Sequence, residues 1–203
     1  MRVLIVGSNG YIGSNLVRYL SSERFDVIAG SRSVISNEAR IENVQYVQLD
    51  LNETITYKKS LAECDIIVYL AGPGALLRQQ SIGKLFQEHL VTFSGFLEEN
   101  SRTNNVPIIF SSSGGTIYGR GNRIPFKEVD PLEPINAYGL LKLMSEELLE
   151  HFHRNSSLKY VSMRISNPYG GINHNKVDQG VINIFIKQFF ANLLSSDFKR
   201  LGN

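Results

Sequence analysis

Tyr138 and Lys142 are spaced so that they could do acid–base chemistry together. If the segment around them is helical, the spacing of four residues places the phenol and the ammonium on one face, one turn apart. A tyrosine has an unperturbed pKa of about 10, too high for a good base at neutral pH, and a neighbouring cation lowers it. The pair therefore predicts proton transfer between Tyr138 and a hydroxyl, assisted by Lys142. An ordinary Tyr–Lys pair on a surface helix is the alternative, so the surrounding elements must decide.

The residues around this pair predict the helix that the chemistry requires. Apolar residues recur at helical spacing through the stretch, at Leu141, Met144, Leu148 and Phe152. The preceding segment, residues 121–134, is polar with three prolines, and we predict a loop. Tyr138 and Lys142 are thus expected on one face of a helix that follows a long loop.

The N-terminal residues predict a site for the diphosphate of a dinucleotide. The apolar run Arg2–Val6 predicts a buried strand, and a helical pattern begins at Ile12. Three glycines lie in the turn between them, where the first permits the tight turn, the second admits the pyrophosphate and the third lets the helix pack on the sheet. A merely structural glycine turn is the alternative. The predicted contacts are Gly7, Asn9, Gly10, Tyr11, Ile12 and Gly13.

The end of the second predicted strand, residues 26–29, bears on the choice of dinucleotide. Dinucleotide-binding folds often carry a carboxylate here for the adenosine ribose, whereas this chain has Ser31 and Arg32. A guanidinium beside hydroxyls suits a 2′-phosphate, because its fork matches phosphate oxygens. NAD or NADP is therefore the predicted cofactor, with NADP favoured. Arg32 stacking on adenine or pointing into solvent is the alternative.

Four further apolar runs predict parallel strands whose carboxyl ends face one ligand crevice. They are residues 44–49, 65–70, 106–110 and 159–165. Helices are predicted at residues 77–100 and 179–194. Six strands alternating with helices predict an α/β fold, a Rossmann-type doubly wound parallel sheet in three α/β/α layers.

Residues just past these strand ends are candidate ligand contacts. Asp50, followed by Leu51, could hydrogen-bond an adenine amino group or could instead cap the next helix. The small residues of Leu70-Ala71-Gly72 would let a loop lie close to a ligand. One of the hydroxyls between Ser111 and Thr116 could orient a substrate, or the stretch could simply turn the chain.

Composition argues against several other classes of function. A net charge of +2 over 203 residues is too small to indicate nucleic acid or an anionic membrane surface as a partner. Cys64 is the single cysteine and is interpreted as a buried structural thiol, and His89 as a core histidine, so no metal site is predicted. No stretch is apolar for long enough to span a membrane. We expect one cytoplasmic domain over residues 1–203.

Together these motifs resemble those of the extended short-chain dehydrogenase/reductase family, in particular its NAD-dependent nucleotide-sugar epimerases and dehydratases. Gly7, Gly10 and Gly13 match the GxxGxxG of that family, and Tyr138 and Lys142 match its YxxxK. The other matches are Asp50-Leu51 with its adenine contact, Leu70-Ala71-Gly72 with its fourth strand exit, residues 111–119 with its serine loop and residues 164–170 with its R-x-x-N-P-x-G loop. Six motifs in the order of the family cover nearly all of the chain.

The resemblance implies oxidoreductase or isomerase chemistry on a nucleotide sugar. Tyr138 would remove the proton of the sugar C4 hydroxyl while a hydride passes to the nicotinamide, and an epimerase would return the hydride to the opposite face. Lys142 would hold the nicotinamide ribose, Ser111 would border the cofactor, and Asn167 would contact the substrate near its diphosphate. A homodimer formed through the tyrosine-bearing helix and its neighbour is also implied.

Three departures from the family pattern qualify this expectation. Gly114 stands where the catalytic Ser or Thr usually lies, so Ser112, Ser113 or Thr116 would have to replace it. Ser113 is preferred, as both a catalytic and a substrate-binding group. His89 occupies a position where a structural Asn is usual. The chain also stops soon after its sixth strand, so the C-terminal substrate lobe is expected to be mostly absent and the crevice open to water.

Two functions remain open at this stage. The serine loop lacks the carboxylate that dehydratases of the family carry, which favours epimerisation or simple reduction. A non-catalytic or truncated NAD(P)-binding module, a sensor or a relic, is the alternative. Retention of Tyr138 and Lys142 argues against this alternative.

Overall fold

The computed structural model describes residues 1–33, 40–73, 81–120 and 124–170, with residues 182, 184–186, 188 and 189. The chain divides into two compact units, Met1–Ser166 and Asn167–Asn203. The sheet lies in the first unit, and the single domain over residues 1–203 stays a prediction. In the second unit the described residues from 182 onwards are helical, in agreement with the helix predicted there.

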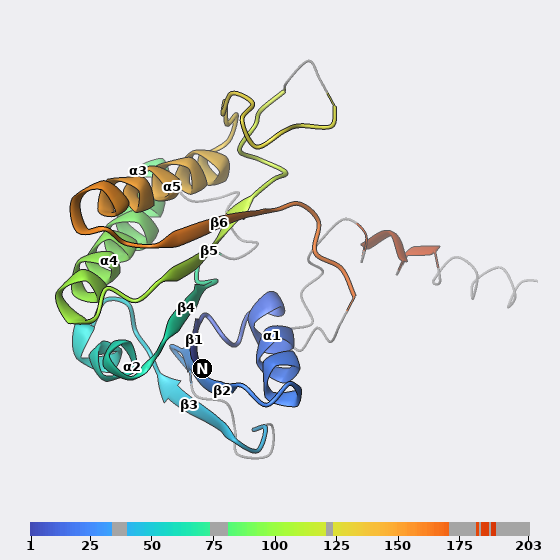
Figure 1. Ribbon diagram of the computed structural model, residues 1–203. Helices are drawn as coiled ribbons and strands as arrows, with labels where there is room; N and C mark the ends of the chain where they lie inside the picture. Colours follow the sequence, from blue (N-terminus) through green and yellow to red (C-terminus); the bar gives the residue numbers. More distant parts are fainter. Residues whose placement is uncertain are drawn as a thin grey trace, which may run out of the picture. The chain divides into compact units, whose positions relative to one another are not determined.

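Six parallel strands form one sheet in the order β3-β2-β1-β4-β5-β6 (Figure 1). They are β1 (Arg2–Val6), β2 (Asp26–Ser31), β3 (Val44–Gln48), β4 (Ile66–Tyr69), β5 (Ile108–Ser113) and β6 (Tyr160–Ile165). The chain moves outward from β1 to β3 and then resumes at β4, on the other side of β1. This reversal puts the topological switch point between β1 and β4, where a doubly wound sheet opens its ligand crevice. The predicted Rossmann-type fold is confirmed.

Side chains of β1 enter a core on each face of the sheet. Leu4 and Val6 belong to a large cluster on one face, while Val3 and Ile5 belong to a smaller cluster on the other. All four are buried, because successive side chains of a strand point to opposite faces and both faces are covered. This explains why the strand is continuously apolar in sequence.

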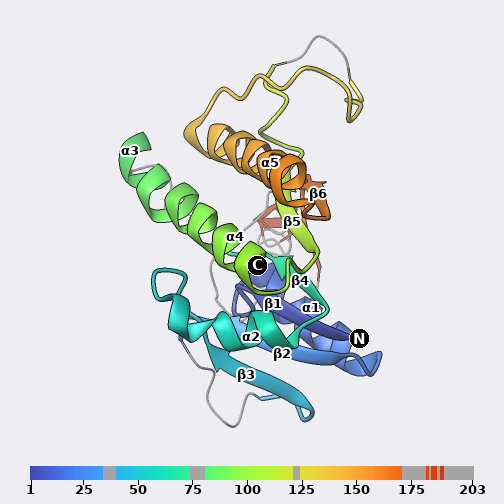
Figure 2. The same ribbon diagram turned by 60° about the vertical axis from the view of Figure 1, so that its left-hand side comes forward.

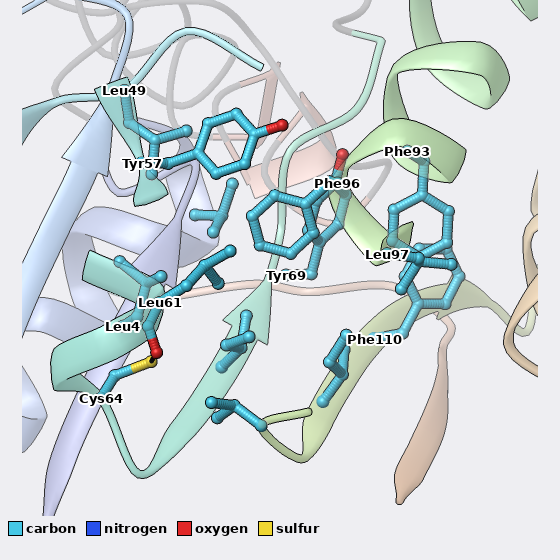
Figure 3. Close-up of a cluster of buried hydrophobic side chains, with 14 of the residues drawn as sticks. Leu4, Leu49, Tyr57, Leu61, Cys64, Tyr69, Phe93, Phe96, Leu97 and Phe110 are labelled. Atoms are coloured by element: carbon cyan, nitrogen blue, oxygen red, sulfur yellow. Dashed lines mark hydrogen bonds between the residues drawn. The ribbon is translucent and has the colours of Figure 1, made fainter. Parts of the chain in front are cut away.

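Helices supply the covering layers on the two faces (Figures 1 and 2). The smaller cluster includes Val17 of α1 (Tyr11–Ser22). The larger cluster lies beneath α2 (Lys58–Glu63), α4 (Thr92–Thr103) and α5 (Ala137–Ser156) and is rich in aromatic rings (Figure 3). Every helix within the described ranges is too short or too polar to cross a lipid bilayer.

The helix predicted at residues 77–100 is present, but its internal structure differs. It consists of α3 (Ile82–Leu85), a π-helical segment η4 (Phe86–Val91) and α4, which runs on to Thr103. Residues 74–80 lie outside the described part. Insertion of a π turn widens a helix locally and is frequent at functional sites. His89 lies within this segment.

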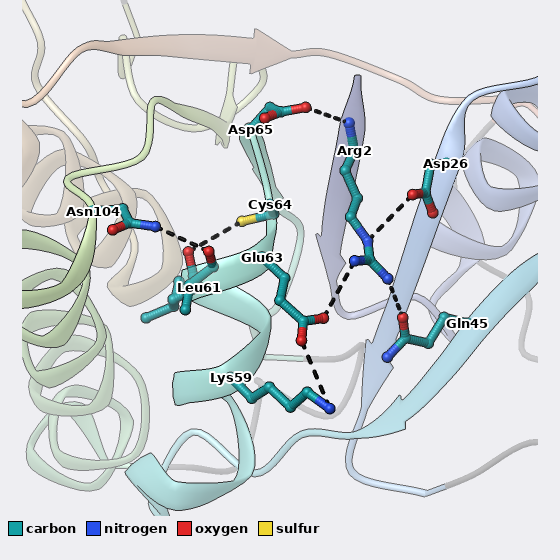
Figure 4. A network of polar contacts seen from close by, with 10 residues as sticks. Arg2, Asp26, Gln45, Lys59, Leu61, Glu63, Cys64, Asp65 and Asn104 are labelled. Carbon is teal, nitrogen blue, oxygen red and sulfur yellow. Dashed lines mark hydrogen bonds and ion pairs between the residues drawn. The ribbon is translucent and has the colours of Figure 1, made fainter.

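A polar network at the amino edge of the sheet sets the alignment of the strands (Figure 4). The Arg2 guanidinium pairs with Asp26 at 3.4 Å and Glu63 at 3.3 Å, and it also donates to Gln45. The Arg2 backbone N–H donates to Asp65 at 2.7 Å. Because these contacts lie at the opposite end of the strands from the crevice, we assign them a structural role.

Candidate active site

The loop after β1 folds tightly over the end of β2 and touches the exit of β4. The backbone N–H groups of Gly7 and Ser8 both donate to the carbonyl of Gly30, at 2.9 and 3.0 Å. Gly7 has a φ of +91°, and a Cβ there would lie 2.8 Å from the backbone nitrogen of Ala71. Two predicted cofactor motifs therefore meet at the switch point, and glycine is required where they meet.

Helix α1 starts in contact with the same loop. A Cβ on Gly13 would lie 2.3 Å from the Gly7 carbonyl oxygen, so glycine allows the helix to pack this closely. Gly10 is the N-cap and contributes no side-chain hydrogen bond to the first turn, where Tyr11 and Ile12 are half-buried. The positive end of the helix dipole therefore faces the loop without a side-chain acceptor from the cap.

The hydroxyl of Ser8 supports an anion site in this loop. Ser8 is only 1% exposed, and its Oγ has no hydrogen-bond partner among the described residues. Buried hydroxyls normally find a partner, so an orphaned one here is consistent with a partner supplied by a ligand. Together with the close approaches of Gly7 and Gly13, this feature fits the diphosphate of a dinucleotide.

The segment after β2 is attached to the glycine loop. The side-chain amide of Asn9 and the hydroxyl of Ser31 both donate to the Ser33 carbonyl, each at 2.7 Å. Arg32, between the two serines, is exposed. This arrangement leaves the guanidinium accessible beside the candidate diphosphate site, and its preference for a 2′-phosphate stays a prediction.

Asp50 does not cap the next helix, so that alternative is wrong. Its Oδ1 accepts from the backbone and side-chain nitrogens of Asn52, at 2.9 and 3.1 Å. The next helix is a short 3-10 turn, Thr54–Thr56, whose N-cap is Glu53. Leu51 packs against the larger core cluster. An adenine contact by Asp50 stays a prediction.

The serines after residue 110 belong to β5 rather than to the predicted loop. Ser111, Ser112 and Ser113 extend the strand because they pair with residues 163–165 of β6. The Thr116 hydroxyl then donates to the Ser113 Oγ at 2.8 Å, while the buried Ser112 Oγ has no partner among the described residues. Two of the predicted replacement hydroxyls are therefore hydrogen-bonded to each other at the carboxyl edge of the sheet.

Gly114 packs so closely against β6 that a side chain at this position would clash with the strand. Its N–H donates to the Ile165 carbonyl at 2.8 Å, which holds it against β6. A Cβ at this position would lie 2.7 Å from the carbonyl oxygen of Arg164. A Ser or Thr at position 114 would thus displace the loop from the strand.

Helix α5 begins directly against this loop. Asn136 is its N-cap and accepts from the Gly139 N–H at 2.7 Å. A Cβ on Gly139 would lie 2.3 Å from the Thr116 carbonyl oxygen, so only glycine permits the contact. The glycine between the two candidate catalytic residues therefore brings the first turn of α5, with Tyr138, to the serine-rich edge.

Tyr138 and Lys142 share one face of α5, as predicted. The Lys142 Nζ lies 5.6 Å from the centre of the Tyr138 ring and 4.7 Å from that of Phe110. Lys142 is only 4% exposed and donates to the Ser111 carbonyl at 2.6 Å. Burial lowers the pKa of Lys142 to about 8, and the charge of Glu146 acts in the opposite direction.

The shift in the pKa of the Tyr138 phenol is opposite in direction to the predicted shift. Burial raises the pKa, whereas a lowered value was expected from the neighbouring ammonium. The ammonium is directed to the Ser111 carbonyl, and desolvation of the phenolate is the dominant effect on the tyrosine. In this structure burial therefore disfavours the phenolate form of Tyr138.

A small cavity of about 20 Å³ lies between the exit of β4 and α5. Its lining includes Gly72, His89, Lys142 and Ser145. The predicted core histidine is thus half-buried at a cavity wall beside the candidate catalytic lysine. Burial lowers the pKa of His89, Glu88 raises it, and the charges of Lys142 and Arg32 lower it further.

Comparison with known proteins agrees with this geometry. The model of the "NAD dependent epimerase/dehydratase family" matches residues 3–203. The chain belongs to this family. A UDP-glucose 4-epimerase of Lactobacillus helveticus is 30% identical over 179 residues, which cover 84% of this chain and 52% of that protein. A dTDP-4-dehydro-6-deoxyglucose reductase of Escherichia coli is 47% identical over 81 residues, 40% of this chain and 25% of that protein.

Solved epimerase structures of the family share the fold. The UDP-glucose 4-epimerase of Thermotoga maritima, solved with UDP-glucose, has a TM-score of 0.78 at 28% identity and covers 91% of this chain. The Thermus thermophilus enzyme, solved with NAD, has a TM-score of 0.78 at 26% identity and the same 91% coverage. This chain spans 62% and 61% of those two chains, about three fifths of their length.

Within the family's R-x-x-N-P-x-G loop, Arg164 makes structural contacts that the sequence did not reveal. Its guanidinium pairs with Glu146 of α5 at 2.8 Å and donates to the Tyr118 hydroxyl and the Glu128 carbonyl, each at 2.9 Å. It therefore joins β6, α5 and the long loop. Asn167, in the second unit, is exposed, and its substrate contact stays a prediction.

No group of three or more His, Cys, Asp or Glu side chains is arranged to hold a metal ion in the described ranges. Cys64 lies in the larger core cluster, where burial raises the pKa of its thiol to about 12. This placement agrees with its interpretation as a structural thiol.

Proposed function

We propose that this chain carries the NAD(P)-binding and acid–base groups of a nucleotide-sugar epimerase-like oxidoreductase. The proposal rests on a series of contacts that runs from the diphosphate loop to Tyr138. Gly7 of the diphosphate loop packs on Ala71, and a Cβ on the adjacent Gly72 would lie 3.7 Å from the Lys142 Nζ. Lys142 in turn lies against Tyr138 and the hydroxyl-bearing end of β5. The candidate cofactor site and the candidate proton-transfer site are thus adjacent.

Each residue has a defined part in the proposed reaction. A bound nicotinamide supplies the hydride acceptor, while the chain moves the proton. The hydrogen-bonded pair of Ser113 and Thr116 would orient a sugar hydroxyl, and Tyr138 would accept its proton. Tyr138 must be in its phenolate form to accept this proton, and Lys142 would stabilise that form, which burial otherwise disfavours. The proposed substrate class follows from the relatives, since the Thermotoga maritima enzyme was solved with UDP-glucose.

Epimerisation or reduction fits the site better than dehydration does. The residues that follow Ser113 are Gly114 and Gly115, and this loop carries no carboxylate to serve as a general acid. Relatives whose names specify either an epimerase or a reductase match the chain. We therefore propose hydride transfer at a sugar carbon without elimination of water.

Replacement of Tyr138 by Phe tests the reaction. We expect turnover of UDP-glucose or UDP-galactose to fall by at least about 100-fold, because the proton acceptor is lost. NAD binding, followed by fluorescence, should be retained. Tyr19→Phe is the matched control, since Tyr19 is 61% exposed on α1. Unchanged turnover in Tyr138→Phe would contradict the mechanism.

The proposed preference for NADP needs its own test, because the relative solved with a dinucleotide contains NAD. Titration of both cofactors against the wild-type chain measures the preference directly. Arg32→Asp should shift it toward NAD, since a carboxylate repels a 2′-phosphate and accepts from ribose hydroxyls. Lys59→Asp makes the same change of charge on α2, where Lys59 pairs with Glu63 at 3.7 Å, and should leave the preference unchanged.

A non-catalytic NAD(P)-binding module is the second candidate. The observation in its favour is that Lys142 is engaged by the Ser111 carbonyl while burial raises the pKa of Tyr138. Tight binding of NAD or NADP, with no turnover of any UDP-sugar, would favour this function. The homodimer predicted through α5 can be examined in the same preparations by light scattering.

A further inference from the structure

Two basic residues from other elements, Lys142 and Arg32, act on His89, and the three are called the basic cluster below. His89 lies on η4, Lys142 on α5 and Arg32 after β2. His89 and Lys142 also line the same small cavity. The positive charges of Lys142 and Arg32 both act against protonation of His89. The histidine therefore belongs to a cluster of basic residues and is not a member of either apolar core cluster.

Nearby carboxylates act on this cluster, but each has another cation as a partner. Glu88 neighbours His89 on η4 and pairs with Lys84 at 3.6 Å. Glu146 acts on Lys142, but its carboxylate pairs with the Arg164 guanidinium at 2.8 Å. Neither carboxylate belongs to the lining of the cavity that His89 and Lys142 share.

On the acid side of neutrality His89 can change its charge, whereas Lys142, with a pKa of about 8, stays protonated there. An ordinary Asn at this position would carry no charge at any pH. In its neutral form His89 leaves the ammonium of Lys142 free to keep its hydrogen bond to Ser111. In its protonated form, two cations line the same small cavity, which disfavours the charge on each.

We propose that His89 is a positioning residue whose protonation repels the ammonium of Lys142 and so controls the cation beside Tyr138. The inference deepens the proposed function, and its catalytic consequence rests on that function. As the pH falls, protonation of His89 would then weaken the stabilisation of the Tyr138 phenolate by Lys142. With a neutral side chain at position 89, this weakening would begin only at a lower pH.

The coupling can be measured on the full chain without cofactor, by NMR titration of the histidine rings. The His89 signal is identified by its loss in His89→Asn. Lys142→Met should raise the titration midpoint of His89 by about half a pH unit or more, because a neighbouring cation is removed. Lys59→Met, which removes a lysine that is 81% exposed on α2, should leave the midpoint unchanged. Lys142→Gln repeats the test if the Met variant does not fold.

A second histidine serves as an internal reference in these spectra. The His153 Nδ1 lies 2.8 Å from the Leu158 carbonyl, and its signal should coincide in spectra of all variants recorded at one pH. An unchanged midpoint of His89 in the Lys142 variants would overturn the inference. An equal rise in the Lys59 variant would overturn it as well.

The pH profile of turnover separates a positioning role from a merely structural one. In His89→Asn and His89→Gln the acid limb of turnover should move to lower pH, because no charge can appear beside Lys142. An acid limb that stays in place in both variants would overturn the inference. Absence of any turnover in the wild-type chain would refute the proposed function, and the NMR titration would then decide on the coupling alone.

Discussion

The ammonium of Lys142 lies 2.6 Å from the carbonyl oxygen of Ser111, so a buried charge joins helix α5 to the last residues of strand β5. This contact exists because the strand continues through three serines beyond its apolar part. Burial of Lys142 also lowers the stability of the fold, because a buried ammonium has lost its hydration. Stability and candidate chemistry thus depend on the same side chain.

Replacement of Lys142 by Met should stabilise the chain at neutral pH and weaken the pH dependence of its stability. Burial lowers the pKa of Lys142 from 10.5 to about 8 in the folded chain. Between these values the unfolded chain binds more protons, so the stability of the wild type rises with pH relative to the variant. Below pH 8 the whole cost of burying the charged lysine is present. A pKa shift of this size corresponds to about 3 kcal/mol, before the loss of the hydrogen bond to Ser111 is counted.

Urea denaturation at pH 7 and pH 9.5 measures this effect. The advantage of Lys142→Met should be about 2 kcal/mol smaller at the higher pH. Lys59→Met should show no such change with pH, because Lys59 is exposed. A difference between wild type and Lys142→Met that is the same at both values would contradict the assigned burial.

Gly139→Ala should destabilise the fold and disturb the site. A Cβ there would lie 2.3 Å from the Thr116 carbonyl, so α5 must move away from the serine-rich edge. We expect a loss of about 2 kcal/mol or more in the free energy of unfolding. Gly115→Ala is the matched control, since nothing lies within 4 Å of a Cβ at that position. Thermal denaturation of both variants measures this difference in stability, and equal stabilities would refute the close contact.

Arg164→Lys should be costly although the charge is retained. The guanidinium contacts Glu146, Tyr118 and the Glu128 carbonyl at once, which a single ammonium cannot reproduce. With both side chains of the ion pair mostly buried, we expect a loss of about 2 kcal/mol. Arg102→Lys, in an exposed i,i+4 pair with Glu98, should cost less than about 0.5 kcal/mol. Chemical denaturation measures both losses in the free energy of unfolding. Similar losses in the two variants would argue against the structural role of Arg164.

Cys64 should react with a thiol reagent only when the chain unfolds. It is 6% exposed, and burial raises the pKa of its thiol to about 12, so very little thiolate is present at pH 8. Native protein mixed with dithionitrobenzoate should show slow release of the chromophore, and urea-unfolded protein a rapid release. Rapid release from native protein would show that the thiol is accessible.

The sequence was sufficient to predict those parts of the fold and site that rest on local patterns. Continuous apolar runs predicted the six strands, and Gly7, Gly10 and Gly13 were correctly predicted to line the turn that the structure places against Ala71. The spacing of Tyr138 and Lys142 predicted their shared face of α5. In these cases the periodicity of side chains determines which face is buried.

Contacts between distant elements could not be predicted in the same way. Helical periodicity does not reveal a π turn, so His89 was assigned to the core rather than to a cavity wall. The rise in the pKa of Tyr138 depends on burial by neighbouring elements, and the engagement of Lys142 depends on a backbone carbonyl from β5. The structural role of Arg164 likewise requires knowledge of which helix lies beside β6.

The contact of Gly114 with β6 restricts how this site can evolve. A mutation that introduces the hydroxyl usual in the family would place a Cβ 2.7 Å from the Arg164 carbonyl, so it would require a shift of β6. A single substitution of Gly114 by Ser or Thr is therefore expected to be harmful unless a second change in β6 accompanies it. The placement of a hydroxyl at this edge can change with less disturbance at Ser113 and Thr116, where the Thr116 hydroxyl already donates to the Ser113 Oγ.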